Sequence, residues 1–468
     1  MTSMHPSTIW LYLARFFPRD VLLGLMAADC TARALLEQRV ASSLKELHRE
    51  IDFRFLHLMD GTAGRLWNRA VADHLRVLRI GPYFVCDALD HSKNVPFRHT
   101  VRPVRSLLAR FRNLEEYHIL WHERPTSTLR RIRPIYDHLS NTLCLASSFL
   151  TVPFSSAPNL RSLTVEISLD KAEHVFLPSF ELPSLRDFSL CIRDDHADDL
   201  DAAGYVMGHH LARFLNNAHR TLRSFSFETS LNTDFSPFFS ALGFFPCLSK
   251  LALSIPTADP HLGDPSTLNV FLRLHRDTLE HFALRGFSTN KSRTDSSCWL
   301  SQCLSEIRFS SLRTLNIGTS FISLDVVILC IEQWADTLTE LDITGEYMSY
   351  EAVEDILDAF VDRPLTSLNM SVTTLCPELV DMLAAYLPHL IKLHLRIRTL
   401  SPHRCEPPTS LGSVRKQKVL EVERFCAEMN RRTYNGWELE DIGIWRFASK
   451  LQYQARCVNA LRDSLRQI

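Results

Sequence analysis

Hydrophobic residues recur along most of the chain in one short pattern, Leu-x-x-Leu-x-Leu, whose later positions also accept Phe, Val, Ile or Met. Clear copies begin at Leu160, Leu185, Leu222, Leu248, Leu279, Leu312, Leu338, Leu365 and Leu390, and weaker copies begin at Leu75 and Leu114. From Leu160 onward, successive copies begin 25 to 37 residues apart. Self-similarity at a period in this range indicates a protein built from stacked repeats.

Each copy of the pattern predicts one strand, and the stretch that follows it predicts one helix. Alternating apolar residues at the end of the motif give a short strand with one buried face. Helical spacing is clearest over residues 324–331, 353–360 and 379–387. A unit this small cannot bury its apolar face alone, so neighbouring units must stack into a continuous core. We therefore predict an α/β leucine-rich-repeat-like solenoid with a curved parallel sheet over residues 51–411.

The residues that precede the predicted strands fall into two groups. Many leucine-rich repeats carry an Asn after the last Leu that bonds the turn backbone, and this Asn is absent here, so other groups must satisfy the turns. Pro precedes several strands, as at Pro183 and Pro388, where it ends the preceding helix and starts an extended segment. Thr precedes others, as at Thr221, Thr278 and Thr337.

The pattern changes after Leu411. A basic run leads into a predicted helix that extends through Met429, followed by a Trp-rich segment over 437–445 and an amphipathic helix near 451–465. The terminal unit of a solenoid must cover an otherwise exposed edge of the core. Residues 412–468 are therefore predicted to form a helical cap.

Composition and charge indicate in which compartment the protein works and which classes of partner it binds. The 468 residues are 46% hydrophobic and carry 52 Lys and Arg against 53 Asp and Glu. This balance lacks the basic excess of a nucleic-acid binder, so we expect no nucleic-acid partner. The 12 cysteines are scattered, which is typical of reduced thiols. With neither a signal peptide nor a membrane-length apolar run, we expect an intracellular protein, cytoplasmic or nuclear, that does not bind membranes.

Motifs for catalysis and for cofactor binding are missing from the sequence. It contains no phosphate-binding Gly-rich loop, no G-x-S-x-G and no H-E-x-x-H. His209 and His210 are adjacent on a predicted helix, so their side chains diverge by about 100° and are unsuited to one metal ion. The acidic loop at 194–201 is interpreted as a solvated connector. We expect no catalytic residues, no metal and no cofactor, and hence a protein that is not an enzyme.

Residues 1–50 differ from the repeats and resemble an F-box. The resemblance rests on a Pro and an Ile in a first short helix, a Phe-Pro break, an acidic residue before a Leu-rich turn, and an Arg in a third helix. These positions are Pro6, Ile9, Phe17, Pro18, Asp20, Leu22, Leu23, Leu25 and Arg33. The usual Leu-Pro-x-Glu start is His5-Pro6-Ser7-Thr8 here. With its repeats, the whole chain resembles the F-box/leucine-rich-repeat proteins of mushroom-forming fungi.

The resemblance implies a non-catalytic substrate receptor of a cullin-based ubiquitin ligase. The head would bind the ligase adaptor in a helix-in-groove contact, and the concave face of the solenoid would hold a protein substrate. The residues implied in adaptor binding are Pro6, Ile9, Leu13, Phe17, Pro18, Leu22, Leu23 and Leu25. The same apolar residues could instead form a helical cap packed on the first repeat. A binding scaffold without ligase engagement, and a receptor or enzyme with a site inside the curve, stay open as alternatives.

A charge pattern near the carboxy-terminal end suggests a substrate-binding surface. Apolar residues alternate inward in the strand at 392–398, so its four basic residues, Lys392, His394, Arg396 and Arg398, share the opposite face. Two units earlier, Glu340 and Asp342 occupy equivalent positions with the opposite sign. We hypothesise that this surface binds an acidic or phosphorylated segment, with Arg396 and Arg398 donating charge-assisted hydrogen bonds. A merely solvated surface is the alternative.

The strand register makes a separate prediction about stability. Leu315, Leu341 and Leu393 should point into the core, where truncation is costly. Their neighbours Asn316 and Asp342 should point away from it and tolerate alanine.

Overall fold

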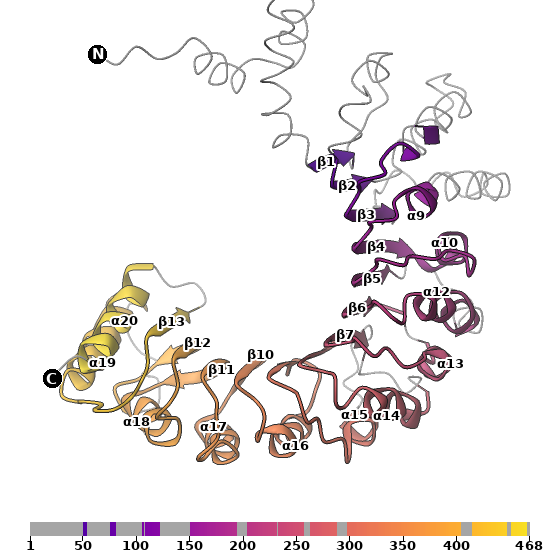
Figure 1. The fold of residues 1–468 in the computed structure, drawn as a ribbon. Coiled ribbons are helices and arrows are strands. Elements are labelled where there is room, and N and C mark those ends of the chain that lie inside the picture. Colours follow the sequence, from indigo (N-terminus) through magenta and orange to yellow (C-terminus); the bar gives the residue numbers. More distant parts are fainter. Residues whose placement is uncertain are drawn as a thin grey trace, which may run out of the picture.

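One curved sheet runs through the described part of the chain, with helices on its outer side (Figure 1). The computed structural model describes residues 50–53, 75–80, 105–106, 108–121, 150–193, 204–231, 233–256, 263–287, 297–403, 414–446 and 451–465. Within these residues, thirteen strands follow one another in chain order, and every neighbouring pair is parallel. The described chain is therefore an α/β repeat solenoid with a curved parallel sheet, as predicted.

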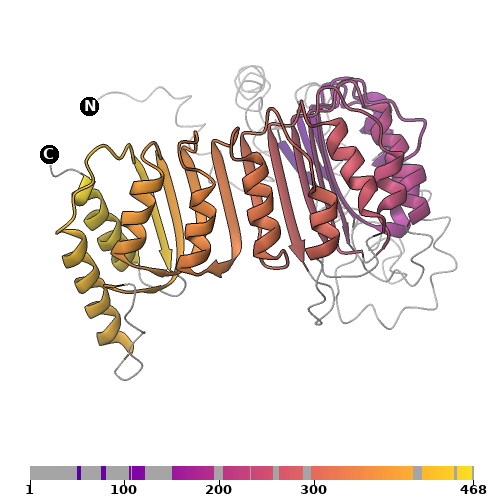
Figure 2. The ribbon, with the colours of Figure 1, turned by 90° about the horizontal axis from the view of Figure 1, so that it is seen from below.

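The strands line the inside of the arc, and the helices stand side by side across their outer face (Figure 2). The strands are β1 Glu50–Phe53, β2 Val77–Ile80, β3 Glu116–Trp121, β4 Ser162–Ser168, β5 Asp187–Arg193, β6 Ser224–Thr229, β7 Lys250–Pro256, β8 His281–Phe287, β9 Thr314–Gly318, β10 Glu340–Met348, β11 Ser367–Leu375, β12 Lys392–Leu400 and β13 Asp441–Arg446. The helical segments are α9 Val152–Ser156, α10 Leu169–Val175, the π-helix η4 Val206–Leu211, α12 Ala212–Asn217, α13 Ser236–Ala241, α14 Pro265–Leu274, α15 Ser297–Leu304, α16 Leu324–Trp334, α17 Tyr350–Asp358, α18 Pro377–Tyr386, α19 Val414–Met429 and α20 Leu451–Leu465.

The core lies between the sheet and the helices, and the repeated Leu positions fill it. In register, Leu315 of β9, Leu341 of β10 and Leu368 of β11 stand side by side, and Leu393 of β12 continues the row. Each of these side chains is at most 2% exposed, so the predicted inward face of the strands is confirmed. Because the strands alternate, every second side chain is left on the inner face of the arc.

At the start of each strand from β3 to β13, two successive backbone amides donate to one carbonyl of the preceding unit. In the unit of β10, the amides of Thr339 and Glu340 both donate to the carbonyl of Arg313, at 2.8 and 2.9 Å. The same pattern recurs along the sheet, for example where the amides of Ile391 and Lys392 both donate to the Thr366 carbonyl at 2.9 Å. The units are thereby linked one to the next through their backbones.

The proline and the threonine that precede the strands each lie in a tight turn. At Pro183, the amide of Leu185 donates to the carbonyl of Leu182 at 3.1 Å, which puts the proline at the turn position it favours. In the other group, Thr337 donates from its hydroxyl to the carbonyl of Trp334 at 3.3 Å. The proline therefore presets the turn, whereas the threonine bonds it with its side chain.

His275 is a fully buried polar residue that joins two units. It follows α14, and the centroid of its ring lies 4.6 Å from that of Phe271, with the two ring planes tilted by 51°. The amide of Phe245 donates to Nε2 at 2.9 Å, so the ring proton sits on Nδ1, which donates to the Phe271 carbonyl at 2.8 Å. Burial lowers the pKa of His275, and the neutral ring satisfies both of its nitrogens.

The segment after residue 411 extends the sheet as well as capping it. The helices expected there are confirmed as α19 and α20, but β13 lies between them and pairs with β12. The Trp-rich segment therefore contributes a thirteenth strand, and the sheet ends one strand later than the predicted boundary. The predicted head at 1–50 lies outside the described residues, except for Glu50 in β1.

Candidate functional site

A row of polar side chains crosses the inner face from β9 to β12. The register aligns Asn316, Asp342, Asn369 and His394 on consecutive strands. Asn316 donates from Nδ2 to Oδ2 of Asp342 at 2.8 Å, and Asn369 donates from Nδ2 to Oδ1 at 2.9 Å. Each carboxylate oxygen of Asp342 therefore has a fixed amide donor, which holds the half-buried side chain in place.

Burial raises the pKa of Asp342, and the positive charges of Arg285 and Arg396 oppose this shift. Arg285 comes from β8 and Arg396 from β12, so the two arginines approach the carboxylate from opposite sides. One anionic group thus lies between two cationic groups.

Both arginines have unused hydrogen-bonding capacity. They are exposed, and within the described residues neither guanidinium makes a hydrogen bond or an ion pair. Gly318 pairs with Arg285 in register, and a Cβ on this glycine would make an ordinary van der Waals contact, at 3.5 Å, with Cγ of Arg285. A guanidinium has five N–H donors in a fixed fork, so each arginine can bind a carboxylate or phosphate through two of them.

Trp445 adds an exposed aromatic surface beside Arg396. The two residues pair in register between β12 and β13, and the indole is 47% exposed. Its ring lies over Gly443, where any Cβ would collide with it, and its centroid is 4.9 Å from the ring of His394 at nearly a right angle. His394 in turn lies 3.4 Å from a carboxylate oxygen of Asp441. Contacts with Gly443 and His394 thus hold the indole in place, while nearly half of its surface stays exposed to solvent.

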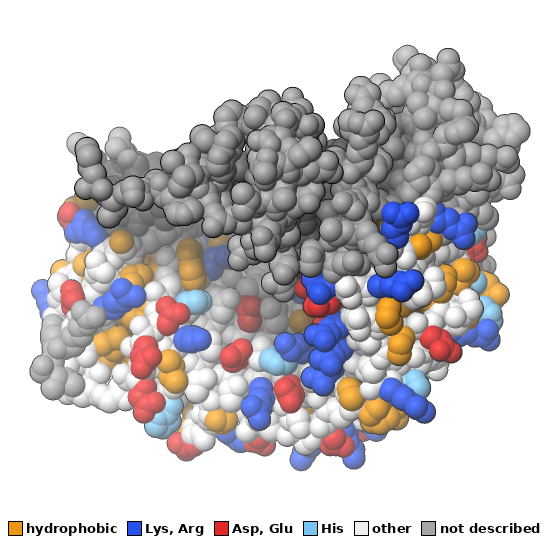
Figure 3. All heavy atoms as spheres, turned by 45° about the horizontal axis from the view of Figure 1, so that its top comes forward, with side chains coloured by type: hydrophobic (Ala, Val, Ile, Leu, Met, Phe, Trp, Pro, Cys, Tyr) orange, Lys and Arg blue, Asp and Glu red, His pale blue; other side chains and the backbone are white. Residues whose placement is uncertain are grey.

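The amino-terminal half of the face has a different electrostatic arrangement. Arg193 of β5 lies between Glu166 and Glu228, at 3.1 Å from a carboxylate oxygen of each. This arginine is already paired on both sides. Within the described residues, Arg285 and Arg396 thus have no ion-pair partner, whereas Arg193 has two. Figure 3 shows cationic, anionic and histidine side chains scattered over a largely uncharged surface.

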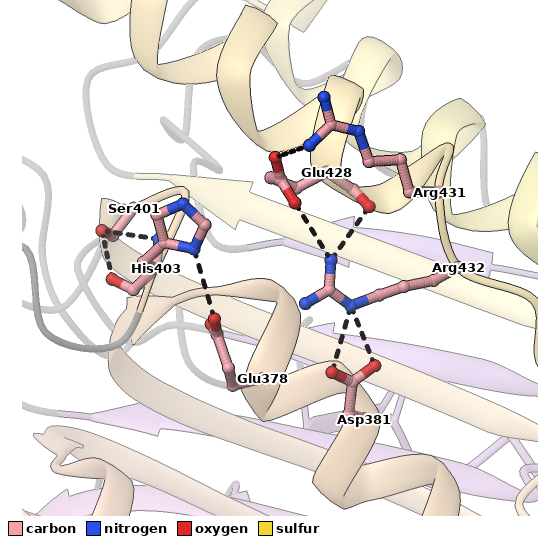
Figure 4. A network of polar contacts seen from close by, with 7 residues as sticks. All are labelled: Glu378, Asp381, Ser401, His403, Glu428, Arg431 and Arg432. Atoms are coloured by element: carbon pink, nitrogen blue, oxygen red, sulfur yellow. Dashed lines mark hydrogen bonds and ion pairs between the residues drawn. The ribbon is translucent and has the colours of Figure 1, made fainter.

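A polar network fastens the carboxy-terminal unit, and with it β13, to the rest of the sheet (Figure 4). Arg432 donates from Nε to both carboxylate oxygens of Asp381 on α18, at 3.0 and 3.1 Å, and from Nη1 to the carbonyl of Glu428 at 2.9 Å. Tyr434 donates its hydroxyl to the same Asp381 carboxylate at 2.6 Å. Burial and this carboxylate raise the pKa of Tyr434, so the phenol keeps its proton.

The candidate substrate-binding residues are distributed along this face as follows. Lys392, Arg396 and Arg398 are exposed on β12, and His394 is half-buried beside them. Arg398 is engaged differently from Arg396, since its guanidinium stacks 5.2 Å from the ring centroid of Tyr347. Glu340 and Asp342 lie on the same face of β10, and the positive charge of Arg396 acts on Asp342.

Sequence reasoning missed four residues of this site: Arg285, Asn316 as a hydrogen-bond donor, Asn369 and Trp445. A signal for the last one was present, because Leu439, Ile442 and Ile444 form one more copy of the repeated pattern. The predicted adaptor-binding residues, Pro6, Ile9, Leu13, Phe17, Pro18, Leu22, Leu23 and Leu25, lie outside the described residues, as does the acidic loop at 194–201.

The described residues contain no group of three or more His, Cys, Asp or Glu side chains suited to a metal ion. None of the described helices is long and apolar enough to cross a membrane. Compared with known proteins, the chain matches no protein-family model and no curated protein sequence.

Proposed function

We propose that the protein is a non-catalytic substrate receptor of a cullin-based ubiquitin ligase. Its amino-terminal head would bind the ligase adaptor, and the inner face of its sheet would hold a protein substrate. The observation that carries the substrate half is the pair Arg285 and Arg396, two exposed arginines without hydrogen-bond partners in the described chain, on either side of Asp342.

An extended acidic or phosphorylated segment fits this surface by charge and by size. The two arginines are four strands apart, and strands in a sheet are spaced by about 4.8 Å, so their backbones are separated by roughly 19 Å. An extended peptide covers that distance with about six residues, at about 3.3 Å per residue. Trp445, next to Arg396, offers an apolar contact at one end of such a segment.

The ligase half of the proposal rests on the resemblance of residues 6–33 to an F-box. Apolar side chains such as Leu22 and Leu23 would enter a groove of the adaptor, and buried apolar contacts usually dominate such interfaces. A binding scaffold without ligase engagement is the second candidate. Such a scaffold would bind its partner through the same inner-face surface, and its head would not bind the adaptor.

Three versions of the full-length chain separate these possibilities. They are the wild type, a head variant with Leu22→Glu and Leu23→Glu, and an inner-face variant with Arg285→Glu and Arg396→Glu. Each is expressed in cells in which the ligase is inhibited, and the captured proteins are quantified by mass spectrometry. We expect the head variant to lose the adaptor and keep the substrates, and the inner-face variant to do the reverse.

The inner-face variant should lose a measurable part of its affinity for substrates. Charge reversal should weaken substrate capture tenfold or more, which corresponds to about 1.4 kcal/mol. Arg276→Glu is the matched control, because Arg276 is an exposed arginine in the turn after α14 and not on the inner face. Substrate capture that survives reversal of both arginines contradicts the surface, and capture without the adaptor in the wild type favours the scaffold.

A further inference from the structure

Two cysteines meet where the last two helices pack together. Cys426 of α19 is half-buried, and Cys457 of α20 is 3% exposed. Sγ of Cys426 lies 3.7 Å from the carbonyl oxygen of Arg456, the residue just before Cys457, and the two thiols hydrogen-bond to each other. Residues 31 positions apart in sequence are thus brought into contact by the packing of α19 on α20.

The groups around Cys426 favour its thiolate. The hydrogen bond from Cys457 has the largest effect, and the positive charge of Arg456 acts in the same direction. Burial and the negative charge of Glu423, which lies 3.9 Å from Arg456, oppose them. The net result lowers the pKa of Cys426 to about 7. The thiolate, which is the nucleophilic form, is therefore more populated near neutral pH than in an ordinary cysteine.

Other cysteines of the described chain have the opposite chemistry. Burial raises the pKa of Cys191, Cys303, Cys330 and Cys376, so these thiols stay protonated at neutral pH. Cys247 is exposed. Among these residues Cys426 combines partial exposure, an acidic thiol and a second thiol in contact with it, which are the features of a redox-active cysteine with its resolving partner.

We propose that Cys426 and Cys457 form a redox-modification site in which a peroxide converts the two thiols to a disulfide between α19 and α20. The Cys426 thiolate attacks one oxygen of hydrogen peroxide, breaks the O–O bond and becomes a sulfenic acid, while the other oxygen leaves as hydroxide and takes up a proton to give water. The sulfur of Cys457 then attacks the sulfenic sulfur and releases its proton with the hydroxyl group as a second water. Two thiols lose two electrons, and one peroxide gains them.

The disulfide would close a loop around β13. The segment from 426 to 457 contains this strand and therefore Trp445, at the carboxy-terminal end of the inner face. A covalent tie between α19 and α20 restricts the unfolding of that unit, because it removes conformations from its unfolded state. The inference does not depend on the proposed receptor function, since its readout is the chemistry of the thiols.

The first test measures alkylation of the full-length protein by iodoacetamide as a function of pH, followed residue by residue with mass spectrometry. Cys426 should react with a midpoint near pH 7. Cys457→Ala removes the hydrogen-bond donor and should slow the reaction at pH 7 about tenfold, whereas Cys457→Ser keeps a donor and should preserve most of the rate. A midpoint near the ordinary value for cysteine, or equal rates in all three proteins, contradicts the proposal.

The second test treats the protein with a slight excess of hydrogen peroxide, blocks free thiols and digests it without reductant. We expect a peptide pair joined through Cys426 and Cys457, two hydrogens lighter than the separate thiols and released by dithiothreitol. Cys247→Ser should form it equally well. In Cys457→Ser, dimedone should trap a sulfenic acid on Cys426 instead. Recovery of Cys426 and Cys457 as blocked free thiols, or of Cys426 joined to another cysteine, overturns the inference.

Discussion

Asn316 donates a hydrogen bond from Nδ2 to Oδ2 of Asp342 across 2.8 Å, and this bond joins β9 to β10 on the inner face of the arc. Asn369 of β11 completes the arrangement from the other side. The expectation from sequence that Asn316 and Asp342 tolerate alanine therefore changes, because the two side chains belong to one network. Asp342 is its centre.

Asp342→Ala should destabilise the protein by about 1–3 kcal/mol, since it leaves two partly buried amides without their acceptor. Asn316→Ala removes one bond and should cost about 0.5–1.5 kcal/mol. Urea unfolding monitored by circular dichroism measures both. Lys392→Ala, an exposed position of β12, is the control and should change little. Equal and negligible effects of Asp342→Ala and Lys392→Ala would show that the network adds no stability.

Leu315→Ala, Leu341→Ala and Leu393→Ala should each cost about 2–5 kcal/mol, because a cavity forms at positions that are at most 2% exposed. The same urea titrations provide the values. An unaltered unfolding midpoint for any of the three would mean that its side chain does not pack in the core as described.

Stability should fall in mild acid because of His275. Burial lowers its pKa, so the unfolded chain binds a proton near pH 6.5, whereas the folded chain resists it down to lower pH. The neutral ring therefore contributes stability above about pH 6.5 and loses it as the pH drops toward the folded pKa. His275→Gln cannot titrate, so the stability difference between wild type and variant should shrink between pH 7 and pH 5.5.

The control for this comparison is His219→Gln, which alters a histidine in the turn between α12 and β6. Thermal unfolding midpoints at four or five pH values suffice. A wild type that gains stability relative to His275→Gln on acidification is the outcome that contradicts the neutral, doubly bonded ring.

The contact between Arg432 and Asp381 should govern the docking of the carboxy-terminal unit. Asp381→Ala removes the acceptor of both Arg432 and Tyr434, and the loss should be about 1–2 kcal/mol, given that these side chains are partly exposed. Hydrogen exchange should accelerate in α19, β13 and α20 and stay unchanged in α16. Arg431→Ala is the matched control, because Arg431, in the turn after α19, forms an ion pair with Glu428 of that helix and is 73% exposed.

The repeated hydrophobic pattern was sufficient to predict the architecture, because one buried face per strand and one per helix are local consequences of residue spacing. Every clear copy from Leu160 to Leu390 supplies a strand of the sheet. The copy at Leu439 was overlooked within a Trp-rich segment, and β13 was missed with it.

The site was predictable only in part, because it depends on contacts between strands. The basic face of β12 follows from alternation along one strand. The relation of Arg285 to Asp342 spans 57 positions and depends on which strands are neighbours and in what register. Likewise, the sequence shows Cys426 and Cys457 as two scattered cysteines, and only the packing of α19 on α20 makes them a pair.

Equilibrium binding of the full-length chain to the purified ligase adaptor, measured by isothermal titration calorimetry, tests the proposed receptor function most directly. The wild type and the Arg285→Glu/Arg396→Glu variant should bind with equal affinity, because the inner face is not part of the adaptor contact. The Leu22→Glu/Leu23→Glu variant should show no binding, since it would bury two unpaired charges, while its unfolding midpoint stays that of the wild type. A wild-type chain that does not bind the adaptor, or a head variant that binds as tightly as the wild type, contradicts the account.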